Sequence, residues 1–135
     1  MERTLMLIKP DAVSRHLIGN ILSIVEREGF RIVDLRMEKF SKNKAKLFYS
    51  VHKDKDFFMH LVNYMTSGKS VGVILERENA VYYLREVVGE TDPAKAKEKT
   101  IRHLYGETYR RNSVHASDSR ESYMYESRIF FKETK

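Results

Sequence analysis

The order of apolar and polar residues along the chain predicts strands that alternate with helices. Residues 4–8 (TLMLI) and 71–75 (VGVIL) are almost wholly apolar, which is typical of strands that are covered on both faces. Pro10 ends the first of them, because proline lacks the N–H that a strand partner needs. Residues 33–39 alternate apolar and charged side chains, the pattern of a strand with one face in water. A short fourth strand is expected at residues 113–115.

The segments between these strands have apolar residues at helical spacing. Residues 17–25 predict one helix, with Gly29 as its C-cap. Ser41 is the expected N-cap of a short helix that follows it. Further helices are expected at residues 57–65, at residues 79–88 and from Ser117 onward. Residues 92–105 show only weak periodicity, and residues 106–112 are polar enough for a loop.

This order of elements predicts an α+β fold. It fits a ferredoxin-like sandwich, in which helices pack on one side of a four-stranded, mainly antiparallel sheet. The chain has 135 residues, of which 41% are hydrophobic and 33% charged, and it shows no internal repeat or linker. Residues 1–135 are therefore expected to form a single domain.

Charge and composition narrow the classes of function. Lys and Arg (25) outnumber Asp and Glu (19), and the net charge of +6 favours an anionic partner such as a nucleotide, a nucleic acid or a lipid surface. The absence of cysteine excludes disulfides, thiolate nucleophiles and cysteine metal sites. The apolar stretch after Arg3 is too short for a signal peptide or a membrane span. A cytoplasmic protein without a membrane partner is expected.

Several motifs argue against other functions. Gly68-Lys69-Ser70 resembles the end of a P-loop, but Asn63 stands where that motif needs its first glycine, and a strand follows instead of a helix. The five histidines lack the spacing of a zinc site. The two central strands contain no aromatic residue on which an RNA-binding domain of this topology would stack bases.

The segment 112–118 (NSVHASD) is the strongest candidate for a functional site. It places His115 between small polar residues, just ahead of a helix whose N-terminal amides favour anions. Glu126 shares a helical face with Tyr123 and Phe130, so its carboxylate points inward, where an unpaired charge would be costly. These residues alone leave two interpretations open: a reactive histidine, or an ordinary loop histidine followed by a helix cap.

Residues 112–119 (NSVHASDS) resemble the active-site motif of nucleoside diphosphate kinases, and residues 2–13 (ERTLMLIKPDAV) are similar to that family's first strand and its lysine. Further matches follow in the family's order: Tyr49, His52, residues 57–58 and 67–68, Arg85, residues 89–91, Pro93, residues 100–102 and Glu126. The resemblance covers nearly the whole chain. It implies transfer of the terminal phosphate from a nucleoside triphosphate such as ATP to a nucleoside diphosphate, by a ping-pong mechanism through a phosphohistidine on His115.

The resemblance also implies a role for each matched residue. His115 is the expected nucleophile, since a neutral imidazole presents a lone pair. Glu126 and Ser117 would orient that imidazole, and Tyr49 would contact the phosphate beside it. Phosphate contacts are expected from His52, Arg85, Thr91 and Arg102, ribose contacts from Lys9 and Asn112, and base contacts from Phe57 and Tyr109. Mg²⁺ is expected as a companion of the phosphates without a protein ligand, and assembly as a homo-oligomer is expected.

Two alternatives from other classes remain at this stage. A catalytically silent relative that serves as an interaction module is disfavoured by the complete set of matched residues. A basic nucleic-acid-binding domain is disfavoured by the missing strand aromatics, so only weak, non-specific binding through charge is expected. Stacking tolerates every base, and the matched residues supply no buried partner for a base edge, so ATP, GTP, CTP and UTP should differ by roughly 1–3 kcal/mol at most. The Tyr109 hydroxyl is the exception left open, since it could add one contact at the base edge or only widen the stack.

Overall fold

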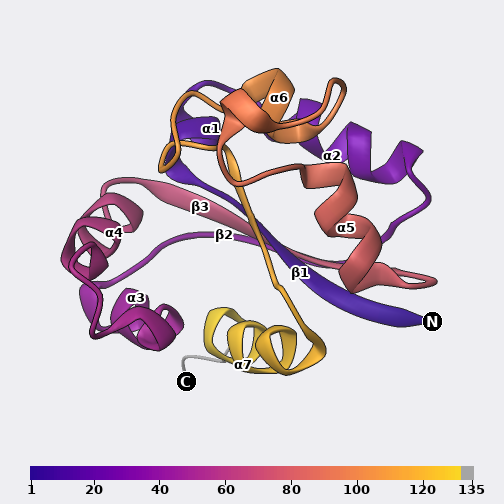
Figure 1. The fold of residues 1–135 in the computed structure, drawn as a ribbon. Coiled ribbons are helices and arrows are strands. Elements are labelled where there is room, and N and C mark those ends of the chain that lie inside the picture. The colour runs from indigo at the N-terminus through magenta and orange to yellow at the C-terminus, as the bar shows by residue number, and fades with distance from the viewer. Residues whose placement is uncertain (132–135) are drawn as a thin grey trace.

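The computed structural model describes residues 1–131 and contains one four-stranded sheet flanked by helices (Figure 1). The strands are β1 (Glu2–Ile8), β2 (Arg31–Lys39), β3 (Lys69–Arg77) and β4 (Val114–Ala116), in the spatial order β2-β3-β1-β4. Every pairing is antiparallel. The α-helices are α1 (Pro10–Ser14), α2 (Ile18–Arg27), α3 (Lys42–Phe48), α4 (Phe58–Met65), α5 (Ala80–Val88), α6 (Ile101–Tyr105) and α7 (Arg120–Phe130), and the short 3₁₀ helices are η1 (Ser50–His52) and η2 (Pro93–Lys95). No helix within residues 1–131 is long and apolar enough to cross a membrane.

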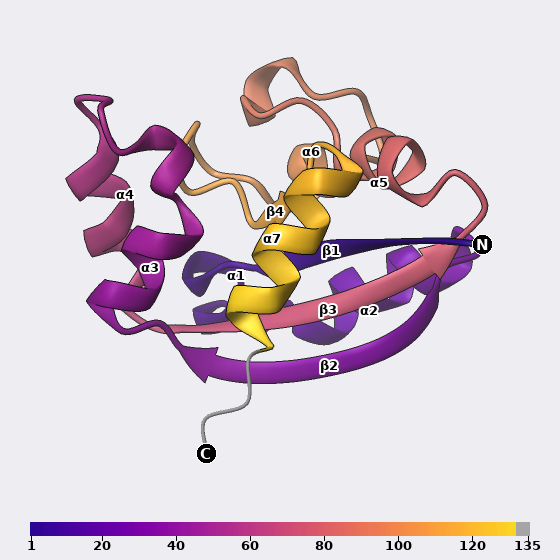
Figure 2. The same ribbon diagram turned by 90° about the horizontal axis from the view of Figure 1, so that it is seen from below.

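Helices cover both faces of the sheet, so the expectation of helices on one side is wrong. Met6 and Ile8 of β1 pack with α2 and α5 in one apolar cluster, whereas Leu5 and Leu7 pack with α3, α4 and α7 in another. Alternate side chains of a strand point to opposite faces, so a strand that is apolar at every position needs cover on both. Figure 1 shows α2 and α5 above the sheet, and Figure 2 shows α7 lying across β1 and β3.

Most element ends follow the signals in the sequence. Ser41 caps α3, because its side chain accepts a hydrogen bond from the Lys44 N–H, and Thr100 caps α6 in the same way. The five-residue helices α1 and α6 are too short to show periodicity, and the sequence did not predict them. The last helix begins at Arg120 with Ser119 as its cap, so the expected start at Ser117 is three residues too early.

The edge strand β2 departs most from its sequence pattern. Leu35 and Met37 are 45% and 46% exposed, so the apolar side of this alternating strand is not buried. Its charged side chains are the ones that find partners: Glu38 forms an ion pair with Lys44 of α3, and Arg36 packs on the ring of Phe131. A register shift between Ile32 and Asp34 marks a bulge just before this segment. Exposed apolar residues on an edge strand are unusual in a protein that acts alone.

Gly72→Ala should destabilise the protein by roughly 1–3 kcal/mol, because an added Cβ would overlap the buried ring of Phe130. Urea unfolding at fixed protein concentration measures the change. Gly19→Ala is the matched control, since Gly19 lies in α2 with no atom within 4 Å of the added Cβ, and it should be neutral or stabilising by up to about 1 kcal/mol. Equal effects of both variants would contradict the close contact between β3 and α7.

Candidate active site

One cavity of about 600 Å³ gathers the residues that the sequence singled out. Its lining contains all of them except Ser117, which bonds to Glu126. The expected residues in the lining are Lys9, Tyr49, His52, Phe57, Arg85, Thr91, Arg102, Tyr109, Asn112, His115 and Glu126. They come from strands, helices and loops along the whole chain, so only the folded protein brings them together.

His115 lies on β4, where it pairs with Leu7 of β1. Its Nε2 lies 2.9 Å from Oε1 of Glu126, and Oγ of Ser117 donates to the same oxygen at 2.6 Å. Because the carboxylate accepts, Nε2 carries the proton in the neutral imidazole, and Nδ1 keeps its lone pair. The rings of Phe48 and Tyr49 pack edge-on against the imidazole, with centroids 5.4 and 5.9 Å away. The histidine is held in one orientation and one tautomer.

Lys9 follows β1 directly and is only 6% exposed. Its Nζ donates to Oδ1 of Asn112 at 2.9 Å and to the backbone carbonyl of Arg110 at 2.7 Å. Burial, partly offset by the nearby carboxylate of Asp11, lowers the pKa of Lys9 to about 8. The ammonium is thus mostly charged at neutral pH, yet it loses its proton far more readily than a surface lysine does.

A buried polar junction holds this lysine against the segment before β4. The backbone N–H of Lys9 donates to the carbonyl of Ser113 at 2.9 Å, and the N–H of Ser113 donates to Oδ2 of Asp11 at 3.0 Å. Asp11 is 2% exposed and also accepts a hydrogen bond from the hydroxyl of Tyr64. Ser113 has φ = 78°, in the left-handed region that few residues other than glycine adopt. The sequence motifs contain both Asp11 and Ser113 but predicted no role for either.

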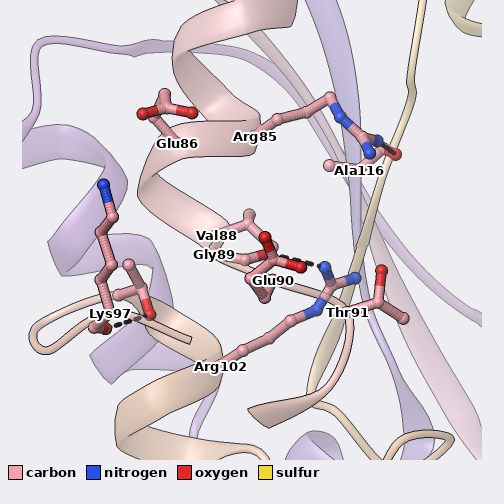
Figure 3. A pocket seen from close by; sticks show the side chains of 10 residues that line it. Arg85, Glu86, Val88, Gly89, Glu90, Thr91, Lys97, Arg102 and Ala116 are labelled. Atoms are coloured by element: carbon pink, nitrogen blue, oxygen red, sulfur yellow. Dashed lines mark hydrogen bonds between the residues drawn. The ribbon is translucent and has the colours of Figure 1, made fainter. Parts of the chain in front are cut away.

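Two arginines face a second, smaller cavity of about 270 Å³, which shares Arg85, Thr91, Arg102 and Ala116 with the first. Figure 3 shows the side chain of Arg85 reaching from α5 toward Ala116, and that of Arg102 reaching toward Gly89. Arg102 donates to the carbonyls of Gly89 and Val114 at 2.9 and 2.8 Å. Burial lowers its pKa to about 10, so the guanidinium remains charged at neutral pH. These two hydrogen bonds hold the guanidinium of Arg102 in place at the wall of both cavities.

The opposite end of the main cavity carries aromatic side chains. Phe57 is 38% exposed and packs against the ring of His52, with centroids 5.4 Å apart. Tyr109 is largely exposed, and its carbonyl accepts a hydrogen bond from Nδ2 of Asn112, which also donates to the carbonyl of Thr91. Nearer to His115, burial raises the pKa of the Tyr49 hydroxyl, which therefore stays protonated and can donate.

These features define a cavity for a polyanionic ligand with an aromatic end. Lys9 and three arginines, Arg85, Arg102 and Arg110, offer positive charge, and the histidine offers a lone pair beside them. Within residues 1–131, no three His, Asp or Glu side chains gather in a way that could hold a metal ion. The donors present suit phosphate oxygens, and an exposed aromatic ring suits a base. The fold and cavity are thus those of a nucleotide-binding protein.

Comparison with known proteins identifies the family. The family model described as nucleoside diphosphate kinase matches residues 2–135. Nucleoside diphosphate kinases of Chlorobaculum tepidum and Nitratiruptor sp. are 48% and 50% identical over 131 residues, which cover 97% of this chain and 94% and 96% of those proteins. The structure of the Aquifex aeolicus nucleoside diphosphate kinase in an orthorhombic crystal form is 42% identical, with a TM-score of 0.94 over 97% of this chain and 95% of that one. An apo structure from Encephalitozoon cuniculi is 32% identical, with a TM-score of 0.95 over 98% of this chain and 90% of that one.

The class is therefore that of nucleotide phosphotransferases. The chain belongs to the nucleoside diphosphate kinase family, as the sequence motifs predicted. It is an enzyme that transfers the terminal phosphate of a nucleoside triphosphate to a nucleoside diphosphate. The family typically uses a divalent metal ion in this reaction.

Lys9 should titrate with a midpoint near pH 8, whereas exposed lysines titrate near 10.4. NMR of ¹³C-labelled lysine side chains measures this, with Lys9→Met to assign the signal and the surface lysines as internal controls. Nucleotide affinity should fall as the pH rises through 8, because the ammonium that attracts phosphate becomes a neutral amine. A Lys9 midpoint near 10.4 would mean that the side chain is open to water.

Proposed function

We propose that His115 carries the phosphate from the donor nucleotide to the acceptor. The bond between Nε2 and Glu126 supports this role, because it leaves the Nδ1 lone pair on a residue that lines the cavity. Nδ1 forms a bond to the terminal phosphorus while the bond from that phosphorus to the bridging oxygen breaks. The diphosphate leaves with the electron pair on its oxygen, and a second diphosphate reverses the step.

Glu126, Ser117 and Tyr49 prepare His115 for this attack. Glu126 holds the proton on Nε2 and stabilises the positive charge that develops on the ring, and Ser117 fixes the carboxylate by its hydrogen bond. The protonated hydroxyl of Tyr49 donates to a phosphate oxygen near the imidazole. The hydrogen bonds from His115 and Ser117 to Glu126 fix the orientation of the imidazole, so little reorganisation is needed in the reaction.

The remaining residues hold the nucleotide. In phosphoryl transfer the charge spreads over phosphate oxygens, so the main need is for fixed cations and donors. Arg85, Arg102, Thr91 and His52 serve the phosphates. Lys9 and Asn112 hold the ribose hydroxyls, and Lys9 also offsets charge at the bridging oxygen. Phe57 and Tyr109 contact the base.

We also propose that the nucleotide enters with Mg²⁺. The lysine and arginine side chains of the cavity cannot ligate a metal, but they suit the outer oxygens of a polyphosphate whose other oxygens hold one. When bound, Mg²⁺ offsets negative charge on the β and γ phosphates. A cytoplasmic location, where nucleoside phosphates are made and consumed, fits this substrate class.

A homo-oligomer is the assembly that we propose. Leu35 and Met37 are exposed on β2, which lies at the edge of the described sheet. Antiparallel pairing of two β2 strands about Leu35 would set Asp34 of one copy opposite Arg36 of the other. Such pairing provides partners for the free backbone N–H and C=O groups of the edge strand and covers the apolar side chains.

Incubation with γ-labelled ATP and Mg²⁺ should leave label on the protein in an acid-labile, alkali-stable form. His115→Gln should abolish this labelling and the phosphotransfer activity together, since no other lone pair occupies that position. Ser117→Ala is the control, and it should still be labelled at His115. Label that survives His115→Gln, or that peptide mapping finds on Ser117, would refute the assignment.

Leu35→Asp should lower the molar mass measured by light scattering, because it places a charge at the centre of the proposed strand pairing. Met124→Asp is matched to it, since Met124 of α7 is an apolar residue that is 53% exposed, and it should leave the mass unchanged. A wild-type protein with the mass of one chain, 16.0 kDa, would exclude the oligomer.

A further inference from the structure

Arg110 lies beside the proposed base site. It lines the main cavity and is half-buried, and its guanidinium carbon is 5.9 Å from the centroid of the Phe57 ring. Its backbone carbonyl accepts the hydrogen bond from Nζ of Lys9. The residue is therefore tied to the lysine proposed to hold the ribose, while its side chain extends toward the aromatic end of the cavity.

The guanidinium of Arg110 differs from its neighbours in having no protein acceptor. Arg102 donates to two backbone carbonyls, and Arg111 pairs with Glu107 at 3.0 Å. Within residues 1–131, the side chain of Arg110 has no hydrogen-bond or ion-pair partner, and its guanidinium lies near the Phe57 ring. At 5.9 Å this contact is at the outer range of cation–π attraction. All five N–H donors remain for a ligand.

The chemistry of a guanidinium favours bases that carry a keto oxygen. Two of its parallel N–H groups match O6 and N7 of guanine, which are both acceptors, whereas adenine presents a donor at position 6. Among pyrimidines, O4 of uracil accepts a hydrogen bond, but the 4-amino group of cytosine does not. A half-buried position strengthens such bonds relative to those in open water.

We propose that Arg110 recognises the edge of the base that stacks on Phe57, and that it makes the enzyme favour guanine over adenine nucleotides and uracil over cytosine nucleotides. This inference rests on the proposed placement of the base at Phe57, and it adds a residue that the sequence motifs did not include. One paired contact of this kind discriminates by about tenfold. All four bases therefore remain substrates.

The test compares GDP, ADP, UDP and CDP as acceptors of phosphate from purified phosphoenzyme. Wild type should show kcat/KM about tenfold higher for GDP than for ADP, with a smaller preference for UDP over CDP. Arg110→Ala should bring both ratios close to one, mainly by raising KM for GDP. Arg110→Lys keeps the charge but cannot form the paired bonds, so it should also lose most of the guanine preference.

Arg111→Ala is the matched control. It removes the same charge at the next residue, whose side chain pairs with Glu107 and does not line the cavity. It should leave both ratios unchanged. A wild-type GDP to ADP ratio near one, or an equal loss for all four bases in Arg110→Ala, would overturn the inference and indicate stacking without recognition. If Arg110→Ala has a lowered melting temperature, the GDP to ADP and UDP to CDP ratios of Arg110→Lys decide whether the side chain recognises the base. A wild type that forms no phosphoenzyme would instead contradict the proposed function.

Discussion

The arrangement of the site depends on the buried junction between residues 9–11 and residues 112–113. Asp11 is almost completely buried, and its carboxylate accepts hydrogen bonds from the backbone of Ser113 and from Tyr64. A buried carboxylate that lost these partners would cost several kcal/mol, so the junction has one stable arrangement. It fixes β4 beside β1, and the position of His115 on β4 follows. The left-handed turn at Ser113 is tolerated because the hydrogen bonds on both sides hold it.

The sequence predicted the sheet better than the layers around it. Strands β1 and β3 were evident because apolar residues occupy both parities, and this same pattern should have indicated helices on both faces. For β2, the alternating pattern showed that the two faces of the strand differ, but it did not show which face other elements cover. Glu38 and Arg36 find partners on the α3 and α7 side, so Leu35 and Met37 remain outside. Short helices such as α6 depend on a cap and on tertiary packing, and neither produces periodicity.

The motifs located residues that the fold brings into one cavity, although their roles remain proposals. Recognition by motif assigned roles to Lys9 and His115, but it assigned none to Asp11 and Ser113, which lie in the same motifs, and it did not include Arg110. A buried aspartate has the same local pattern as a helix-starting one, and Asp11 follows Pro10 in the first turn of α1. A positive φ at a serine leaves no trace in the sequence. Arg110 precedes a second arginine in a polar loop, so only the structure separates the one that faces the cavity.

The cavity draws on both halves of the sandwich. Tyr49 and Phe57 come from the α3–α4 side of the sheet, whereas Arg85 and Arg102 come from α5 and α6 on the other. A nucleotide that spans them acts as a reversible cross-link between the two layers. Saturation at a hundred times the dissociation constant would add about 2.7 kcal/mol to the free energy of unfolding. A nucleotide bound as proposed would therefore also serve as a structural element in a cell rich in nucleotides, and the enzyme would be least resistant to heat and proteases when its substrates are scarce.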